Sequence, residues 1–284
     1  MNKSAPETVC LALGPYRNLT TLTASLLFLH PRCQVLNHGS DRILPDPRIN
    51  FLLDYSDARF EAFVSAAIEL SASGKRGRYG GSITLSHAFD DKQIQDAYSS
   101  RFKDVRVKEN IDCLFWKESL RVTDFIRKHN VNLREIFEQN DKLRFLMPIR
   151  NPIDCTLSNL KTGRAKDLVE ESEGSLFTDV LDAILQDIDW FLSLQARYPE
   201  RFFCFYENAF NREMVCEMAE FLRLDCDPGW VDDVMSNYNI RHPYEHTNSM
   251  KTIYAGLVKQ YFESRPQARR PLETFLDQSG CADG

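Results

Sequence analysis

The sequence predicts an α/β fold in which a mainly parallel β-sheet carries helices on both faces, a three-layer architecture like that of P-loop proteins. Short apolar runs of strand length alternate along the chain with segments of helical periodicity, and this alternation is typical of parallel sheets. The 284 residues are 43% hydrophobic and 27% charged, as in an ordinary globular protein. Since no linker, repeat or low-complexity segment interrupts them, we expect one domain over residues 1–284.

The first predicted element is a buried strand over residues 8–13, which Gly14 and Pro15 close. A helix then begins at residue 18 or 20, with leucines on one face up to Leu29. The loop between strand and helix therefore places backbone N–H groups and the positive end of a helix dipole together, which favours a phosphate or sulfate.

The remaining elements follow from the same patterns. Pro152 suits the first turn of a helix that Asn151 caps. The other predicted strands cover residues 34–37, 111–116, 143–149 and 202–206, and the other predicted helices cover residues 56–71, 120–129, 132–140, 175–198 and 211–222, before a mostly helical C-terminal part.

Composition excludes several classes of protein. The net charge of −6 argues against a broad nucleic-acid-binding surface. We expect neither a membrane span, since no apolar run is long enough, nor a signal peptide, since residues 1–9 lack its apolar core. Its eight cysteines are scattered without a CxxC pair. We therefore expect a cytoplasmic protein with reduced, buried thiols, and neither a disulfide framework nor a zinc site.

Two strand-to-helix junctions carry an arginine together with hydroxyl groups. The first holds Arg17, Thr20 and Thr21, and the second holds Arg150 and Ser158. Such junctions meet at the carboxyl edge of a parallel sheet, where ligands bind. The guanidinium group of an arginine and hydroxyl groups are good hydrogen-bond donors to phosphate oxygens. The two junctions together therefore predict a ligand with two separated anionic groups.

The first loop, GPYRNLTT, departs from the Walker pattern that an NTPase uses. Leu19 stands where that pattern has its second glycine, the lysine is missing, and no acid at a strand end is placed to hold Mg²⁺. A ligand that already carries its leaving group and needs no metal fits better. A basic, glycine-rich loop at residues 74–81 either shapes a substrate mouth or is simply solvated.

Four segments together resemble the sulfotransferase family that uses 3′-phosphoadenosine-5′-phosphosulfate (PAPS). GPYRNLTTL resembles the 5′-phosphosulfate loop, FWKES the strand-end lysine segment, PIRNPIDCTLS the 3′-phosphate segment RNPxDxxxS, and FYENA a later strand end. They occur in the family's order and span residues 9–209. The third segment is the most specific, because the spacing of eight between its arginine and serine is kept.

The resemblance implies the residues that bind the donor and assist its leaving group. Lys117 matches the family lysine that approaches the bridging oxygen as the S–O bond breaks. Arg17, Thr20 and Thr21 match residues at the 5′-phosphosulfate, with Asn18 as a further donor-binding residue, and Arg150 and Ser158 match residues at the 3′-phosphate.

A general base is also needed to take the proton of the acceptor. In cytosolic members a histidine follows the lysine segment, but here that segment reads Lys117-Glu118-Ser119, so this histidine is absent. His38 follows the second predicted strand at the active edge, and histidine is the side chain best suited to exchange protons near neutral pH. We assign the base to His38, with Glu118, His87 and Asp41 as alternatives.

These observations predict a metal-independent, bacterial-type sulfotransferase. It would move the sulfonate of PAPS to a hydroxyl or amine of a small-molecule acceptor, for example in specialised metabolism. Two alternatives stay open: a P-loop-type nucleotide or small-molecule kinase, and a non-catalytic nucleotide-binding protein of the same fold. Neither nucleic acid nor membrane is an expected partner.

Overall fold

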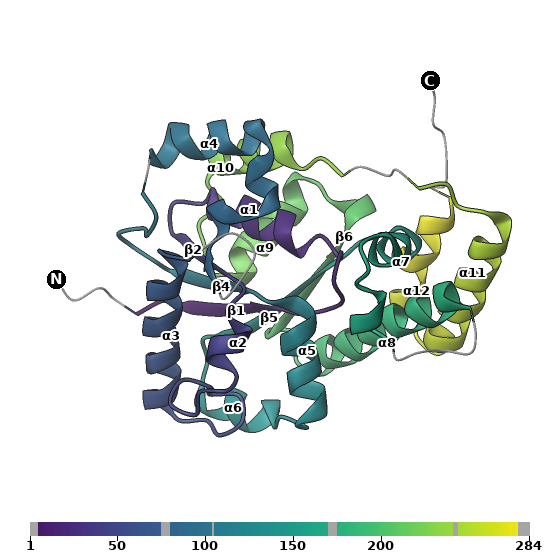
Figure 1. Cartoon of the computed structure of the whole chain (residues 1–284), viewed down its shortest axis with the longest axis horizontal. Coiled ribbons are helices and arrows are strands. Elements are labelled where there is room, and N and C mark those ends of the chain that lie inside the picture. The colour runs from purple at the N-terminus through teal and green to yellow at the C-terminus, as the bar shows by residue number, and fades with distance from the viewer. Residues whose placement is uncertain (1–4, 75–79, 104, 170–174, 241–243, 278–284) are drawn as a thin grey trace. The chain divides into compact units, whose positions relative to one another are not determined.

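A computed structural model describes residues 5–74, 80–103, 105–169, 175–240 and 244–277. In this part of the chain six strands form one sheet in the order β3-β2-β4-β1-β5-β6. Figure 1 labels all of these strands except β3. β2, β4, β1 and β5 are parallel neighbours, whereas β3 pairs antiparallel with β2. The predicted mainly parallel sheet is confirmed. The strands are β1 (Thr8–Ala12), β2 (Cys33–Asn37), β3 (Gly81–Ser82), β4 (Cys113–Lys117), β5 (Leu143–Ile149) and β6 (Phe202–Tyr206).

Helices connect and flank these strands. Three of the predicted helix starts are visible as caps: Ser56 accepts from the backbone of α3, Asn151 from α7 and Asn211 from α9. The helices are α1 (Thr20–Phe28), α2 (Ser40–Ile43), α3 (Asp57–Ser71), α4 (Lys92–Phe102), α5 (Ser119–Lys128), α6 (Leu133–Gln139), α7 (Pro152–Lys161), α8 (Leu176–Arg197), α9 (Arg212–Phe221), α10 (Pro228–Asn237), α11 (Asn248–Phe262) and α12 (Pro266–Glu273).

The core explains why the central strands are mostly apolar and do not alternate between apolar and polar residues. Every residue of β1, β2 and β4 is buried, so both faces of these strands are covered, as in parallel sheets flanked by helices. The large side chains at the centre include Trp116, Phe115 and Phe145, each almost fully buried. Burial of each such side chain stabilises the fold by about 1.5–3 kcal/mol.

The chain forms two compact units. The first comprises Met1–Leu13, Thr20–Leu146 and Asn211–Asn239, and the second comprises Gly14–Leu19, Met147–Phe210 and Ile240–Gly284. The chain thus leaves the first unit for one short loop, residues 14–19, and re-enters it at the start of α1. The single domain over residues 1–284 stays a prediction.

One expectation about the cysteines is wrong. Cys216 of α9 and Cys226 are joined by a disulfide, with Cα atoms 5.2 Å apart. The cause is local, because the chain folds back after α9 and brings the two residues together within ten positions. The described free cysteines include Cys10, Cys33 and Cys113, all buried as expected.

Candidate active site

His38 follows the last residue of β2 and is held by its backbone. In the sheet register Asn37 pairs with Lys117 of β4. The His38 N–H donates to the Lys117 carbonyl at 3.1 Å, and the His38 carbonyl accepts from the Trp116 indole at 2.8 Å. His38 has φ 62, a left-handed conformation that non-glycine residues adopt rarely and often at functional sites.

The imidazole of His38 lies between a cation and an anion. Its Nε2 is 3.5 Å from Lys117 Nζ, and its Nδ1 is 3.5 Å from Glu118 Oε1. Because an ammonium group only donates and a carboxylate only accepts, the neutral tautomer that suits both contacts carries its proton on Nδ1 and leaves Nε2 as the acceptor. The His38 side chain is 40% exposed and that of Glu118 only 3%. We call these three residues, His38, Lys117 and Glu118, the His38 cluster.

Glu118 is a fixed carboxylate within this cluster. Burial alone would raise its pKa, but the hydrogen bond and charge of His38, the charge of Lys117 and the backbone N–H of Ser40 lower the pKa below its ordinary value. Ser40 donates to Oε2 at 3.3 Å, so both oxygens are engaged. An ionised, buried and doubly bonded carboxylate is suited to orient the imidazole rather than to abstract a proton.

The two other candidate bases lie in different surroundings. Asp41, at the start of α2, forms an ion pair with Arg121. His87 is exposed at the start of the short helix His87–Asp90. The glycine-rich loop that we associated with a substrate mouth falls mostly on residues 75–79, which lie outside the described residues. Its end, Gly80, lies close to Gly39, since a Cβ at Gly80 would be 2.9 Å from Gly39 Cα.

The second unit brings together four of the residues predicted to bind the phosphates of the nucleotide. Arg17 Nε donates to Ser158 Oγ at 2.9 Å, and the Arg150 backbone N–H donates to Asn18 Oδ1 at 2.9 Å. Arg150 Nη1 also reaches the Arg17 carbonyl at 3.5 Å. We call Arg17, Asn18, Arg150 and Ser158 the Arg150 cluster. Arg17, expected at the 5′-phosphosulfate, is thus hydrogen-bonded to a residue expected at the 3′-phosphate.

Thr20 and Thr21 belong to the first unit, where they begin α1. Thr20 is buried and Thr21 half-buried. Thr20, Thr21, His38 and Lys117 therefore belong to the first unit, whereas the residues of the Arg150 cluster belong to the second.

The loop before α1 reaches its shape without the second glycine of a Walker loop. Arg17 has φ 65 and Leu19 has φ 58, so Leu19 adopts the left-handed conformation that a glycine would favour. For a residue with a side chain this costs roughly 1–2 kcal/mol. Gly14 has φ 105, and a Cβ there would lie 2.9 Å from the end of the Met147 side chain, so the strand exit needs glycine.

Arg150 is flanked by two carboxylates that sequence reasoning did not assign to the site. Its Nη2 is 3.9 Å from Asp154 Oδ2 and its Nε is 4.0 Å from Glu207 Oε2. Glu207 also accepts from the Asn151 N–H at 2.7 Å. Both acids occur in the segments already singled out, RNPID and FYENA, and a buried arginine there calls for such partners.

The polar atoms of the Arg150 cluster fit an anionic ligand. Asn18 Nδ2 is buried and has no hydrogen-bond partner among the described residues. It is a donor, as are the arginine nitrogens and the Ser158 hydroxyl. A buried donor without a partner is costly unless an acceptor satisfies it, and phosphate oxygens are strong acceptors.

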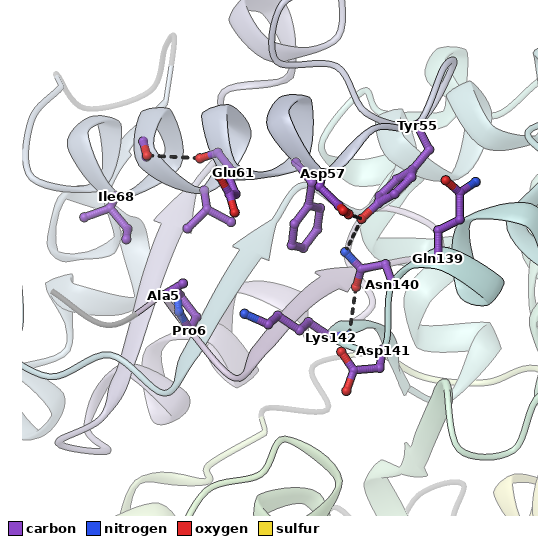
Figure 2. A pocket seen from close by; sticks show the side chains of 13 residues that line it. Ala5, Pro6, Tyr55, Asp57, Glu61, Ile68, Gln139, Asn140, Asp141 and Lys142 are labelled. Atoms are coloured by element: carbon purple, nitrogen blue, oxygen red, sulfur yellow. Dashed lines mark hydrogen bonds between the residues drawn. The ribbon is translucent and has the colours of Figure 1, made fainter. Parts of the chain in front are cut away.

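A separate cavity of about 600 Å³ lies in the first unit beside α3 and the segments that lead into β1 and β5 (Figure 2). At its edge the Tyr55 hydroxyl donates to Asp57 at 2.8 Å and accepts from Asn140 at 2.9 Å. These segments precede their strands, whereas His38 and Glu118 follow theirs. The cavity is therefore at the amino edge of the strands, and none of the predicted site residues lines it.

The described residues lack two further features. They contain no cluster of three or more histidine, cysteine or acidic side chains arranged to hold a metal ion. No helix among them has both the length and the apolar character that a membrane span requires.

Comparison with known proteins yields distant structural likenesses. No protein-family model matches the sequence, and no curated protein matches it. Solved structures that match include sulfotransferase STF9 from Mycobacterium avium, at 14% identity and TM-score 0.43 over 93% of this chain and 78% of that one. A sulfotransferase from Alicyclobacillus acidocaldarius matches at 13% identity and TM-score 0.41, over 98% of both chains. The sulfotransferase domain of the Synechococcus PCC 7002 olefin synthase matches at 14% identity and TM-score 0.42, over 97% and 96%.

Proposed function

We propose that this chain is a sulfotransferase that moves the sulfonate of PAPS to a hydroxyl or amine of a small-molecule acceptor. The observation that carries the proposal is the His38 cluster. It combines a cation for a leaving group, an imidazole nitrogen free of its proton, and a buried carboxylate that orients the imidazole, at the carboxyl ends of neighbouring parallel strands.

Each residue of the cluster has one role in this reaction. When bound, PAPS supplies the sulfonate and a phosphate leaving group. His38 Nε2 takes the proton of the acceptor as its oxygen or nitrogen attacks sulfur. Lys117 places its ammonium charge where negative charge grows on the bridging oxygen as the S–O bond breaks. Glu118 keeps the Nδ1 proton in place and stabilises the imidazolium that forms.

The Arg150 cluster supports binding of the nucleotide. Arg17, Arg150, Ser158 and Asn18 present donors of the kind that phosphate oxygens accept. Because Arg17 Nε and Ser158 Oγ are hydrogen-bonded, we propose that they hold the same phosphate, the 3′-phosphate. Thr20 and Thr21, at the first turn of α1, are proposed to hold the 5′-phosphosulfate.

The test is transfer of labelled sulfonate from PAPS to a panel of phenols, alcohols and amines. His38→Ala is expected to lower the turnover rate by about 10²–10⁴-fold while leaving the affinity for adenosine 3′,5′-bisphosphate unchanged. His129→Ala, which removes an exposed histidine at the end of α5, is the matched control and should turn over normally. Full activity of the His38→Ala enzyme would remove His38 from the base role.

Other outcomes separate the alternatives. Mg²⁺-dependent turnover of ATP, with no gain in thermal stability from adenosine 3′,5′-bisphosphate, would establish a kinase and refute the proposal. Tight binding of that nucleotide without transfer to any acceptor would identify a non-catalytic binding protein.

A further inference from the structure

His246 makes a buried contact within the second unit that the proposed reaction does not use. Its Nε2 lies 2.6 Å from Asp154 Oδ1, and the two side chains are only 6% and 1% exposed. A carboxylate can only accept, so Nε2 carries the proton and donates to Asp154. The other ring nitrogen, Nδ1, has no hydrogen-bond partner among the described residues. The polar contact of the imidazole is therefore directed at Asp154.

Asp154 in turn faces the arginine of the Arg150 cluster. Asp154 lies in the first turn of α7, four residues after Arg150, and its Oδ2 is 3.9 Å from Arg150 Nη2. One oxygen of the carboxylate thus meets His246 while the other meets the guanidinium. A carboxylate held at one oxygen has little freedom to rotate, so its direction at Arg150 depends on His246.

The charge balance gives this contact a further effect. Asp154 and Glu207 place two negative charges within 4.0 Å of one guanidinium. A hydrogen bond from His246 withdraws part of the Asp154 charge from Arg150. More of the arginine's charge then remains for an anionic ligand than two unrestrained carboxylates would leave.

We propose that His246 is a positioning residue for Arg150, acting through Asp154, and that it raises the affinity of the Arg150 cluster for a phosphate. The inference rests on the proposed function in taking the ligand of Arg150 to be the nucleotide's 3′-phosphate. His246 is not among the residues that we propose to contact the substrate or the reacting atoms. It stands 92 residues from Asp154 in the sequence, in the segment that leads into α11.

Two amide variants distinguish positioning from simple packing. Glutamine reaches about as far as His246 Nε2 and can donate to Asp154, whereas asparagine is one methylene shorter and cannot. The affinity for adenosine 3′,5′-bisphosphate is measured by calorimetry for the wild type, His246→Gln and His246→Asn. We expect His246→Asn to weaken binding about tenfold and His246→Gln to stay within about threefold of the wild type, the effect of one charge-assisted hydrogen bond.

The unfolding temperatures of both variants, without nucleotide, are measured alongside. Equal nucleotide affinities of His246→Gln and His246→Asn would overturn the inference. An affinity difference that merely follows the unfolding temperatures of the variants would overturn it too, because it would report packing and not positioning. Normal nucleotide binding by the wild type and by His246→Asn would overturn it while leaving the proposed function intact. If the wild type itself does not bind the nucleotide, the proposed function fails, and the role of His246 fails with it.

Discussion

The amine of Lys108 is expected to make the stability of this protein rise with pH. Its Nζ donates to the carbonyl oxygens of Phe28, His30 and Cys33, the last at 2.7 Å. It also lies 4.4 Å from the centre of the Phe28 ring and 4.6 Å from that of Phe102. The lysine is 2% exposed. Its ammonium group therefore loses its hydration and instead contacts three carbonyl groups and two aromatic rings near the end of α1.

Burial lowers the pKa of Lys108 from 10.5 to about 7. Between these values the unfolded chain holds the proton and the folded chain has lost it. The unfolded state therefore binds more protons in this window, and the free energy of unfolding increases with pH. The slope is about 1.4 kcal/mol per pH unit. From about pH 7.5 to about pH 9 the contribution of Lys108 amounts to about 2 kcal/mol.

The assay is urea unfolding of the wild type and of Lys108→Met at both pH values. The difference between the two proteins should move by about 2 kcal/mol in favour of the wild type at the higher pH. Lys128→Met is the matched control, because the Lys128 side chain is 75% exposed and its removal should leave the pH dependence unchanged.

A direct titration of the Lys108 amine by NMR would complete the experiment. A midpoint near 10.5, together with parallel pH dependences of the wild type and Lys108→Met, would refute the reasoning. It would mean that the three carbonyl groups compensate the ammonium charge in full, and that burial costs this lysine nothing.

Two further predictions concern the His38 cluster. Glu118→Gln removes the charge behind the imidazole and should lower the rate of sulfonate transfer about 10–100-fold, with unchanged nucleotide affinity; an unchanged rate would contradict the orienting role. Gly80→Ala places a Cβ 2.9 Å from Gly39 Cα at a residue with φ 80, and should cost about 1–3 kcal/mol of unfolding free energy and reduce transfer. Gly163→Ala is the control for backbone strain alone, because Gly163 has φ 68 and nothing lies within 4 Å of a Cβ there. An equal loss of unfolding free energy in both variants would argue against a clash between the Gly80→Ala Cβ and Gly39 Cα.

The parallel core of the fold could be predicted because its strands are buried on both faces. A run such as residues 9–13 is then apolar throughout and stands out from the helices around it. The edge strand β3 has only two residues, Gly81–Ser82, and its pairing with β2 depends on tertiary contact rather than on any local preference. A sequence pattern cannot reveal a strand of that length.

The site could be predicted only as far as strand ends reveal it. Arg150 and Ser158 keep a recognisable spacing, and His38 follows a strand, so their positions are visible in the sequence. The contact of His246 with Asp154 is not, because no short pattern links residues so far apart. The role of Glu118 was also hidden: sequence reasoning ranked it as an alternative base, whereas burial and two partners make it a fixed carboxylate.

The sheet register explains how the proposed base, His38, lies next to Lys117 although no histidine follows that lysine. Asn37 pairs with Lys117, so the next residue of each strand, His38 and Glu118, leaves the sheet at the same level. The left-handed turn at His38 is secured by the carbonyl of Lys117 and the indole of Trp116. In the proposed mechanism the base thus follows the end of β2, and the residue after the lysine, Glu118, orients its imidazole. A base and its orienting group on neighbouring strands are placed by the most rigid part of the fold, which is where preorganised catalytic groups are best supported.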